Sequence, residues 1–402
     1  MTTTVDAWSV PARARERIES IARRPSFEAN PCLYLYDLEA ISASIAHTGV
    51  LPKPFVVYYA MKANPHPQIL DLMATHPQIG GVDVSSVGEL DLALRFFHPS
   101  RISFTGPAKT PAELQVAVDA GIGRVHLESR VEAQRLNKCA TRPIGTLVRL
   151  NSAHHETSKG NGLQFGIHEG DFIDAALEIS KLPNVSVEGV HSFPGSGLLD
   201  ADDAAAFACR TLGVAEEMTR HGMLVRSVNV GGGFGVDYGA PDVRFDVGRY
   251  GAALRGQPLI NDLGLDSLTI DLGRFLVAAA GYYVTEIIDI KHAGTSIHLI
   301  TTGGINHQRR PYAHDCNMPI SILPRNHTPS QAVVYETEVT VNGPTLASYD
   351  VLGRNVWVDQ ADVGDLLVLG LAGAYGLNLA PVEFLLRPKA EEHVMNKVRG
   401  AA

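Results

Sequence analysis

Residues 54–64, PFVVYYAMKAN, join an apolar run to a single lysine, Lys62. The run is rich in β-branched and aromatic side chains, which predicts a buried strand. Pro65 and Pro67 then interrupt the strand, and a helical pattern begins near Gln68. We therefore expect Lys62 at the C-terminal end of a strand, where a buried, neutral amine could form a Schiff base with a carbonyl compound. A solvent-facing lysine just beyond a strand end is the alternative.

The same alternation of strand and helix repeats along the chain. Strand-like runs fall at 54–60, 79–84, 102–105, 123–127, 145–150, 186–192, 226–230 and 267–271. Helical patterns fall at 67–75, 88–97, 111–120, 129–138, 170–181, 201–221 and 241–255. Strands that alternate with helices indicate a parallel sheet. Eight such strands match a (β/α)8 TIM barrel, and a doubly wound open sheet is the alternative.

The pattern changes near residue 276. Strand-like segments follow at 282–288, 295–301, 332–341 and 366–369, with little helical pattern between them. A strand predicted at 32–36, after a helical lead-in over residues 1–30, could join this part. We therefore predict an α/β plus β fold: a barrel at 38–275, and a C-terminal β-sandwich or barrel-like domain built from 1–37 and 276–402.

The composition is that of an ordinary soluble protein. The chain has 402 residues, of which 45% are hydrophobic and 19% are charged, with a net charge of −9. It has no long Lys/Arg block, so we expect no nucleic-acid partner, and no apolar run of about 18 residues, so we expect no membrane span. The N-terminal segment lacks the apolar core of a secretory signal. The scattered cysteines, Cys32, Cys139, Cys209 and Cys316, indicate reduced thiols in the cytoplasm and no metal site.

Chemically active residues gather at the predicted strand ends, where barrels of this type place their function. The charged and polar residues there are Lys62, Asp83, Arg149, His191, Asp271 and Arg274. Two glycine-rich segments, 195–197 and 231–235, follow two further strand ends. Structural needs alone rarely bring all of these to one face, so we expect a functional site there.

Each of these groups suits part of one cofactor. The glycines of 231–235 let backbone N–H groups approach an anion, although a tight turn would explain them alone. Ser196 and Arg274 could add a hydroxyl and a forked cation for a phosphate. Asp271 could face a ring nitrogen, and His191 could stack on a flat ring, with a hydrogen-bonded core histidine as the alternative. A lysine, a phosphate site and a carboxylate for a ring nitrogen together predict pyridoxal 5'-phosphate.

The motifs resemble those of the fold type III pyridoxal-phosphate decarboxylases, which include diaminopimelate, ornithine and arginine decarboxylases. The resemblance extends over about residues 32–388, and its motifs lie at 59–64, 83–90, 191–200, 231–235, 271–274 and 373–376. It implies a barrel with a C-terminal β domain, and a homodimer with active sites at the interface. The cofactor-binding residues that it implies are Lys62, Asp83, Arg149, His191, Ser196, Gly232, Gly233, Phe234, Gly235, Asp271, Gly273, Arg274 and Tyr375.

Within the family, the chain looks more like a subgroup in secondary metabolism than like the lysine-pathway enzyme. The features that favour this subgroup are the spacing of His191, Phe193 and Gly195, the residue Leu272, and the segments 303–311 and 373–377. Some members of the subgroup decarboxylate amino acids tethered to a carrier protein, and others act on siderophore intermediates. The resemblance therefore implies an amino-acid-type substrate, either free or tethered to a carrier protein.

Three positions depart from the family pattern. Asp271 stands where the family usually has Glu, and Thr302 stands where many members have Asp, which argues against a diamine-type substrate. Leu346 stands where the family has a catalytic cysteine that reprotonates the carbon after carbon dioxide leaves. Leucine cannot donate a proton. Another donor is therefore needed, and the candidates are Tyr349, Asp350 and His307.

We predict a pyridoxal-phosphate-dependent amino acid decarboxylase whose catalytic residues are Lys62, His191, Asp271, Tyr349 and Asp350. The alternatives are decarboxylation coupled to oxidation or carbon–carbon bond formation, a racemase, and a protein that binds the cofactor without turnover. Residues 151–164 are polar and glycine-rich, and we expect them to form a substrate loop. Arg309, Arg310 and Tyr312 could bind a distal carboxylate, with a solvated loop as the alternative.

Overall fold

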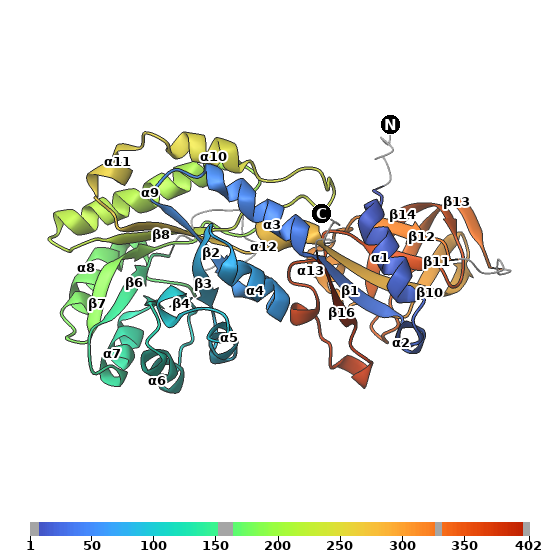
Figure 1. Cartoon of the computed structure of the whole chain (residues 1–402), viewed down its shortest axis with the longest axis horizontal. Helices are drawn as coiled ribbons and strands as arrows, with labels where there is room; N and C mark the ends of the chain where they lie inside the picture. The colour runs from blue at the N-terminus through green and yellow to red at the C-terminus, as the bar shows by residue number, and fades with distance from the viewer. Residues whose placement is uncertain (1–7, 152–163, 326–331, 397–402) are drawn as a thin grey trace, which may run out of the picture. The chain divides into compact units, whose positions relative to one another are not determined.

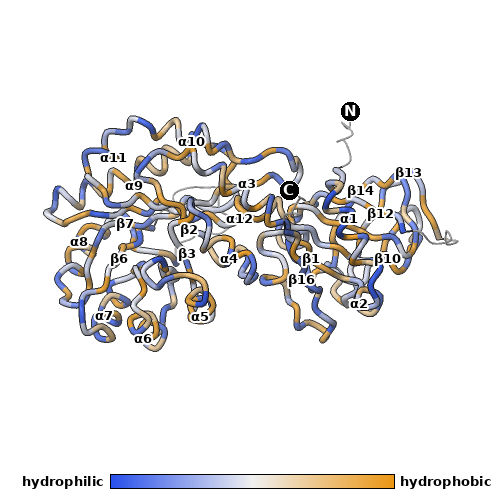
Figure 2. The backbone as a smooth tube through the Cα atoms, viewed as in Figure 1, coloured by the Kyte–Doolittle hydropathy of each residue, from blue (hydrophilic) through white to orange (hydrophobic). Residues whose placement is uncertain are grey.

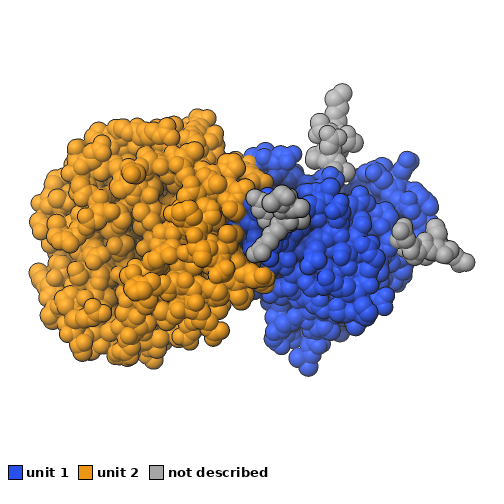
Figure 3. Space-filling view, in the orientation of Figure 1, with its two compact units in different colours: residues 1–41, 237–243, 277–402 blue, residues 42–236, 244–276 orange. Residues whose placement is uncertain are grey.

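The computed structural model describes residues 8–151, 164–325 and 332–396. The expected substrate loop at 151–164 lies almost entirely outside them. The chain forms two compact units, coloured separately in Figure 3: unit 1 holds 1–41, 237–243 and 277–402, and unit 2 holds 42–236 and 244–276. The ranges 38–275 and 1–37 with 276–402 stay a prediction about domains, because compactness does not show that either part folds alone.

Unit 2 is a closed barrel of eight parallel strands (Figure 1). The strands are β2 (Phe55–Ala60), β3 (Ile79–Val84), β4 (Ile102–Phe104), β5 (Arg124–Leu127), β6 (Ile144–Arg149), β7 (Val185–His191), β8 (Ser227–Gly232) and β9 (Ser267–Leu272). Each strand pairs in parallel with the next, and β9 closes the ring by pairing with β2. The predicted TIM barrel is confirmed, and the open doubly wound sheet is excluded.

Helices surround these strands. They are α3 (Leu38–His47), α4 (Pro67–Thr75), α5 (Val87–Ala93), α6 (Pro111–Ala120), α7 (Arg130–Cys139), α8 (Glu169–Ser180), α9 (Ala201–Arg220), α10 (Val247–Leu254), α11 (Pro258–Asp262) and α12 (Arg274–Val277). Helix α6 begins with a capping box in which Thr110 and Glu113 satisfy each other's backbone N–H groups. In Figure 2 the outer helices alternate between hydrophilic and hydrophobic residues, as expected when one helix face packs on a barrel and the other faces solvent.

Unit 1 is built on a mainly antiparallel sheet. Its strands are β1 (Cys32–Asp37), β10 (Gly281–Ala293), β11 (Ser296–Thr301), β12 (Ile320–Leu323), β13 (Val334–Asn342), β14 (Val351–Ala361), β15 (Leu366–Leu369) and β16 (Glu391–Met395), with helix α13 (Arg310–His314) between β11 and β12. The sheet order is β12-β15-β10-β11-β13-β14, and β1 pairs with β10 and β16. The early strand therefore joins the β domain, as the sequence suggested.

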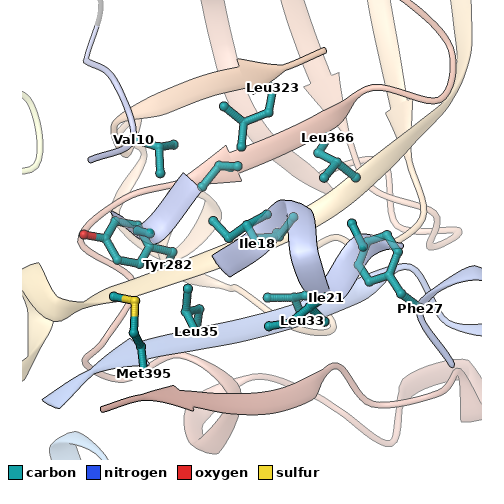
Figure 4. Close-up of a cluster of buried hydrophobic side chains, with 14 residues drawn as sticks. Val10, Ile18, Ile21, Phe27, Leu33, Leu35, Tyr282, Leu323, Leu366 and Met395 are labelled. Atoms are coloured by element: carbon teal, nitrogen blue, oxygen red, sulfur yellow. The ribbon is translucent and has the colours of Figure 1, made fainter. Parts of the chain in front are cut away.

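One hydrophobic cluster fixes the N-terminal helices to this sheet (Figure 4). Helix α1 (Ala12–Ala22) contributes Ile18 and Ile21, and helix α2 (Pro25–Ala29) contributes Phe27. They pack on Leu33 and Leu35 of β1, with further buried side chains from β10, β12, β15 and β16. Burying each such side chain is worth about 1.5–3 kcal/mol, so the lead-in helices are integral to this unit.

Among the helices that the structure describes, none has the length and apolar character needed to cross a membrane.

Candidate active site

The predicted residues from the barrel strands meet at one end of the barrel. Asp83 lies in β3, Arg149 and His191 are the last residues of β6 and β7, and Asp271 lies near the end of β9. Lys62 follows β2 directly, in the short 3₁₀ turn Met61–Ala63. Because all eight strands run parallel in a closed ring, these strand ends form a single rim.

Lys62 is exposed on this rim, so the expectation of a buried lysine is wrong. Its turn buries the two flanking residues, Met61 and Ala63, and the Tyr59 hydroxyl donates to the carbonyl of Asn64 at 2.8 Å, which closes the turn. The turn thus leaves the lysine itself open to solvent. The Lys62 charge nevertheless acts on Asp271, whose pKa would rise further without it.

One carboxyl oxygen of Asp271 accepts a hydrogen bond within the protein, and the other has no hydrogen-bond partner. Its Oδ2 accepts a hydrogen bond from Asn229 Nδ2 at 2.9 Å, and Asn229 Oδ1 in turn accepts from the backbone N–H of Gly231 at 2.8 Å, which fixes the amide. Oδ1 is buried and has no hydrogen-bond partner. Burial, and next the negative charge of Asp83, raise the pKa of Asp271 to about 8. An unpaired buried carboxyl oxygen is the group that a protonated ring nitrogen would satisfy.

His191 is a neutral, flat surface. The residue is buried, and burial holds its pKa well below the usual value. Its Nδ1 is buried without a hydrogen-bond partner, and its ring lies against that of His126, with centroids 4.4 Å apart. The explanation of His191 as a hydrogen-bonded core histidine does not account for the vacant Nδ1. A neutral imidazole at the rim suits stacking on an aromatic ligand.

The two glycine-rich loops come together as one structure. The N–H groups of Gly197 and Leu198 both donate to the carbonyl of Gly233 at 2.9 Å. Gly233 has a φ of +79°, and a Cβ there would lie 1.9 Å from the carbonyl oxygen of Gly195. No other residue fits this position. Arg274 Nη2 reaches Ser196 Oγ at 3.5 Å, so the loops and the arginine form a cradle of the kind that binds phosphate.

Four further predicted residues support this cradle in different ways. A Cβ at Gly232 would collide with the Asp271 carbonyl, and one at Gly273 would press on Ala63 in the lysine turn. Phe234 is buried and stacks on Phe245 at 3.7 Å. The N–H of Gly235 donates to Leu198 at 2.7 Å. These residues therefore shape the loops, and the Gly235 N–H is already used within the protein.

Arg149 and Asp83 already form an ion pair and hydrogen bonds, respectively, with other residues of the barrel. Arg149 Nη1 pairs with Glu128 Oε1 at 2.6 Å, and both residues are buried. Asp83 Oδ1 accepts from the hydroxyls of Ser103 and Thr105. Their role as cofactor ligands stays a prediction. The pairing of Glu128 was not predicted, although Glu128 directly follows β5 and therefore lies on the same rim.

The remaining predicted residues lie in unit 1. Tyr375 is half-buried and has a φ of +53°. Tyr349 is 45% exposed and stacks on Tyr312, with ring centroids 4.3 Å apart. Tyr349 and Tyr312 line a cavity of about 300 Å³ together with Arg309. Arg310 instead lies over the ring of Tyr238 at 3.5 Å.

The three candidate proton donors differ in their surroundings. Asp350 is buried and accepts from the backbone N–H groups of Ile305 and Thr345, both at 2.8 Å. Both ring nitrogens of His307 are engaged, Nδ1 with the Tyr283 hydroxyl and Nε2 with the Pro388 carbonyl. Tyr349 alone among the three is exposed. The geometry therefore favours Tyr349 over the other two.

No cluster of three or more His, Cys, Asp or Glu side chains suited to a metal ion occurs among residues 8–151, 164–325 and 332–396.

The site defines a class of protein. A (β/α)8 barrel whose rim carries a lysine, an unpaired buried carboxyl oxygen, a neutral imidazole and a phosphate cradle fits the aldehyde, the ring nitrogen, the ring face and the phosphate of pyridoxal 5'-phosphate. A model of the family described as "Pyridoxal-dependent decarboxylase, pyridoxal binding domain" matches residues 39–278. The chain belongs to this family, and it is a pyridoxal-phosphate-dependent carboxy-lyase.

Similar proteins extend the comparison to the whole chain. A 2-[(L-alanin-3-ylcarbamoyl)methyl]-2-hydroxybutanedioate decarboxylase of Staphylococcus aureus is 31% identical over 392 residues, covering 93% of this chain and 96% of that protein. An L-glutamyl-[BtrI acyl-carrier protein] decarboxylase of Niallia circulans is 30% identical, covering 88% and 86%. The structure of Helicobacter pylori diaminopimelate decarboxylase with L-lysine superposes with a TM-score of 0.82 at 25% identity, covering 94% and 93%.

Proposed function

We propose that this enzyme removes the α-carboxylate of an amino-acid unit that is part of a larger natural-product intermediate, with pyridoxal 5'-phosphate held on Lys62. The observation that carries the chemistry is the vacant Oδ1 of Asp271, buried on the same rim as Lys62. The relatives support the substrate class. One is named for an alanine unit linked by an amide to a hydroxybutanedioate, and the other for a glutamyl group on a carrier protein.

Thr302 supports a substrate without a distal ammonium group. Its hydroxyl lies 2.9 Å from the Thr285 hydroxyl and donates to the Pro31 carbonyl at 3.1 Å. No carboxylate is present at this position to pair with an amine. Arg309, which lines the 300 Å³ cavity with Tyr312, is the cation that we assign to a distal carboxylate.

Different residues of the chain would bind different parts of the cofactor. Lys62 would hold the aldehyde carbon of the cofactor covalently, and Arg274, Ser196, Tyr375 and the Gly233 loop would hold its phosphate. Asp271 would keep a proton on the ring nitrogen, and the face of His191 would fix the plane of the ring. When bound, the cofactor supplies an electron sink for the electron pair that remains as carbon dioxide leaves. Arg149 and Glu128 neutralise each other beside this site.

Two measurements test the proposal. The first is borohydride reduction of the holoenzyme followed by peptide mass analysis, which should find the reduced adduct on Lys62. The second is product analysis with free L-amino acids, amide-linked amino acids and carrier-tethered amino acids. We expect equal amounts of carbon dioxide and amine from a linked substrate. An adduct elsewhere would refute the role of Lys62, and an aldehyde or ketone product would refute simple decarboxylation.

Oxidation or carbon–carbon bond formation is the second candidate, because the family's proton-donating cysteine is replaced by Leu346. Leu346 is 89% exposed in the loop between β13 and β14, so the position is accessible to solvent but its side chain has no proton to donate. Tyr349 lies three residues further along the same loop. We propose that Tyr349 is the donor that keeps the reaction a simple decarboxylation.

Tyr349→Phe is expected to slow amine formation on the order of 10²-fold, the loss typical of a general acid, while single-turnover release of carbon dioxide stays near wild type. Tyr335→Phe is the matched control, because Tyr335 is also an exposed tyrosine of unit 1, at 58%. Adding Leu346→Cys to Tyr349→Phe should restore amine formation if the loop tip reaches the reacting carbon. Unchanged amine formation in Tyr349→Phe would exclude it as the donor.

We also propose a cytoplasmic homodimer. All four cysteines are free thiols, which suits a reducing compartment. Unit 1 exposes several large apolar side chains, among them Leu346, Phe384, Leu385 and Leu386, and Leu386 is 86% exposed. Exposed apolar side chains of this size favour burial against a partner, and a second copy of the chain is the partner that we assign.

Leu386→Asp is expected to shift the chain from dimer toward monomer, because it places a charge in the apolar contact. Sedimentation velocity at several concentrations measures the change. Leu224→Asp is the matched control, since Leu224 is an exposed leucine of unit 2, at 66%. A monomeric wild-type protein at micromolar concentration would contradict the proposal.

A further inference from the structure

A connected row of buried side chains runs from β3 through β5 to His191 at the end of β7. Asp83 on β3 accepts a hydrogen bond from Thr105, which follows β4, and the Thr105 hydroxyl lies 2.8 Å from Nδ1 of His126 on β5. The ring of His126 lies against that of His191, with centroids 4.4 Å apart and planes inclined by 41°. All four residues are buried in unit 2. The row joins an acidic group on one strand to the imidazole at the end of another.

The hydrogen bonds define the tautomer of His126. Asp83 Oδ1 accepts hydrogen bonds from two hydroxyl groups, those of Ser103 and Thr105. Since the Thr105 hydrogen points to Asp83, the Thr105 oxygen is left to accept from His126, whose Nδ1 therefore carries the proton. Burial and the nearby cations Arg124, Lys109, Arg149 and Lys62 hold the pKa of His126 well below its usual value, so the ring is neutral. Thr105 thereby prevents rotation of the His126 ring.

His191 depends on that ring for its own orientation. Its Nδ1 has no hydrogen-bond partner, so no bond at this atom fixes the plane of the imidazole. The ring of His126, which is tilted against that of His191, is the contact that can do so. Nε2 of His126 is likewise buried without a partner, which means that this ring is held by Thr105 on one side and by packing alone on the other.

We propose that His126 is a positioning residue, which Thr105 and Asp83 clamp so that its ring sets the plane of His191 against the cofactor. The inference rests on the proposed function in one respect, namely that the pyridoxal ring lies on His191. His126 does not touch the reacting atoms. It acts through the imidazole that does.

Thr105→Val tests the clamp, because valine keeps the shape of threonine and removes its hydroxyl. Thr146→Val is the matched control: Thr146 is a buried threonine of β6 whose hydroxyl donates to the Ser186 carbonyl at 3.0 Å, and Ser186 is not a member of the row. Two readouts are independent of turnover. One is the NMR position of the His191 ring protons in the cofactor-free protein, assigned with His191→Gln, and the other is the circular dichroism of the bound cofactor.

We expect Thr105→Val to shift the His191 ring signals, to change the cofactor dichroism and to weaken cofactor binding roughly five- to tenfold, the effect of one buried hydrogen bond. Thr105→Ser should restore all three, and Thr146→Val should change none. His126→Phe should keep more of the dichroism than His126→Leu, because phenylalanine still provides an aromatic ring against His191.

His191 signals in Thr105→Val that match those of Thr146→Val would overturn the proposal. Should Thr105→Val fail to fold, the comparison of His126→Phe with His126→Leu decides the question, and equal dichroism in these two would overturn it. A wild-type chain that binds no cofactor would refute the proposed function, whereas the NMR comparison would still decide the clamp.

Discussion

Lys62→Ala is expected to lower kcat on the order of 10³-fold or more, the scale of loss when an enzyme's covalent group is removed. The only other lysine described at this end of the barrel is Lys109, and it cannot substitute. Its Nζ is paired with Glu132 at 2.7 Å and donates to the carbonyls of Gly106 and His126. The phosphate cradle does not involve Lys62, so the variant should still bind the cofactor without a covalent bond.

The measurement for Lys62→Ala combines product formation, cofactor titration and borohydride trapping. We expect no trapped adduct, a spectrum close to that of free pyridoxal phosphate, and a measurable dissociation constant. Lys53→Ala is the control, because Lys53 is also exposed and lies just before β2. An adduct on another lysine, or activity within tenfold of wild type, would show that Lys62 is not the attachment site.

The barrel was predictable because its strands are buried on both sides. The strands of the ring appear in the sequence as short segments in which apolar residues predominate, although β8 reads SVNVGG and β9 reads SLTIDL. The predicted and observed boundaries of the strands agree within two residues. The strands of unit 1 were harder to predict from the sequence. Strand β14 contains Gly353 and, at Asn355, a φ of +50°, and β16 reads EEHVM. Such strands are defined by their neighbours in the sheet rather than by their own residues.

The site was predictable where topology alone places a residue. Strand ends in a parallel barrel must share a rim, so Lys62, His191 and Asp271 could be assembled without coordinates. Contacts between side chains were not predictable in the same way. His126 lies within the four-residue strand RVHL, which gives no sign of His191 beside it, and nothing in the sequence pairs Arg149 with Glu128.

Asp271→Asn is the substitution with the second-largest expected effect. An amide cannot hold a proton on the ring nitrogen, so the cofactor loses its electron-sink character, and we expect kcat to fall roughly 10²–10³-fold, as when one charge-stabilising group is removed. Asp271→Glu should retain more activity, because it keeps the carboxylate. Asn229→Ala should give an intermediate loss, since it frees Asp271 Oδ2 without removing the charge. Equal activity in the Asn and Glu variants would contradict the role of the carboxylate.

The raised pKa of Asp271 predicts how cofactor affinity depends on pH. Below about pH 8 the carboxyl of the cofactor-free protein already carries the proton that it will share with the ring nitrogen. Binding then requires no proton from solvent. Above the pKa the carboxyl is ionised, a proton must be taken up on binding, and affinity should fall about tenfold per pH unit.

Lys62→Ala is the background in which this pH effect is cleanest. The substitution prevents covalent attachment of the cofactor, so only the non-covalent affinity is measured. It also removes a cation that lowers the pKa of Asp271, so the affinity should begin to fall at a pH above about 8. The double variant Lys62→Ala/Asp271→Asn should bind with no such slope between pH 7 and pH 10. A flat affinity in Lys62→Ala itself would mean that Asp271 does not hold the ring proton, and the assignment of its vacant Oδ1 would fail with it.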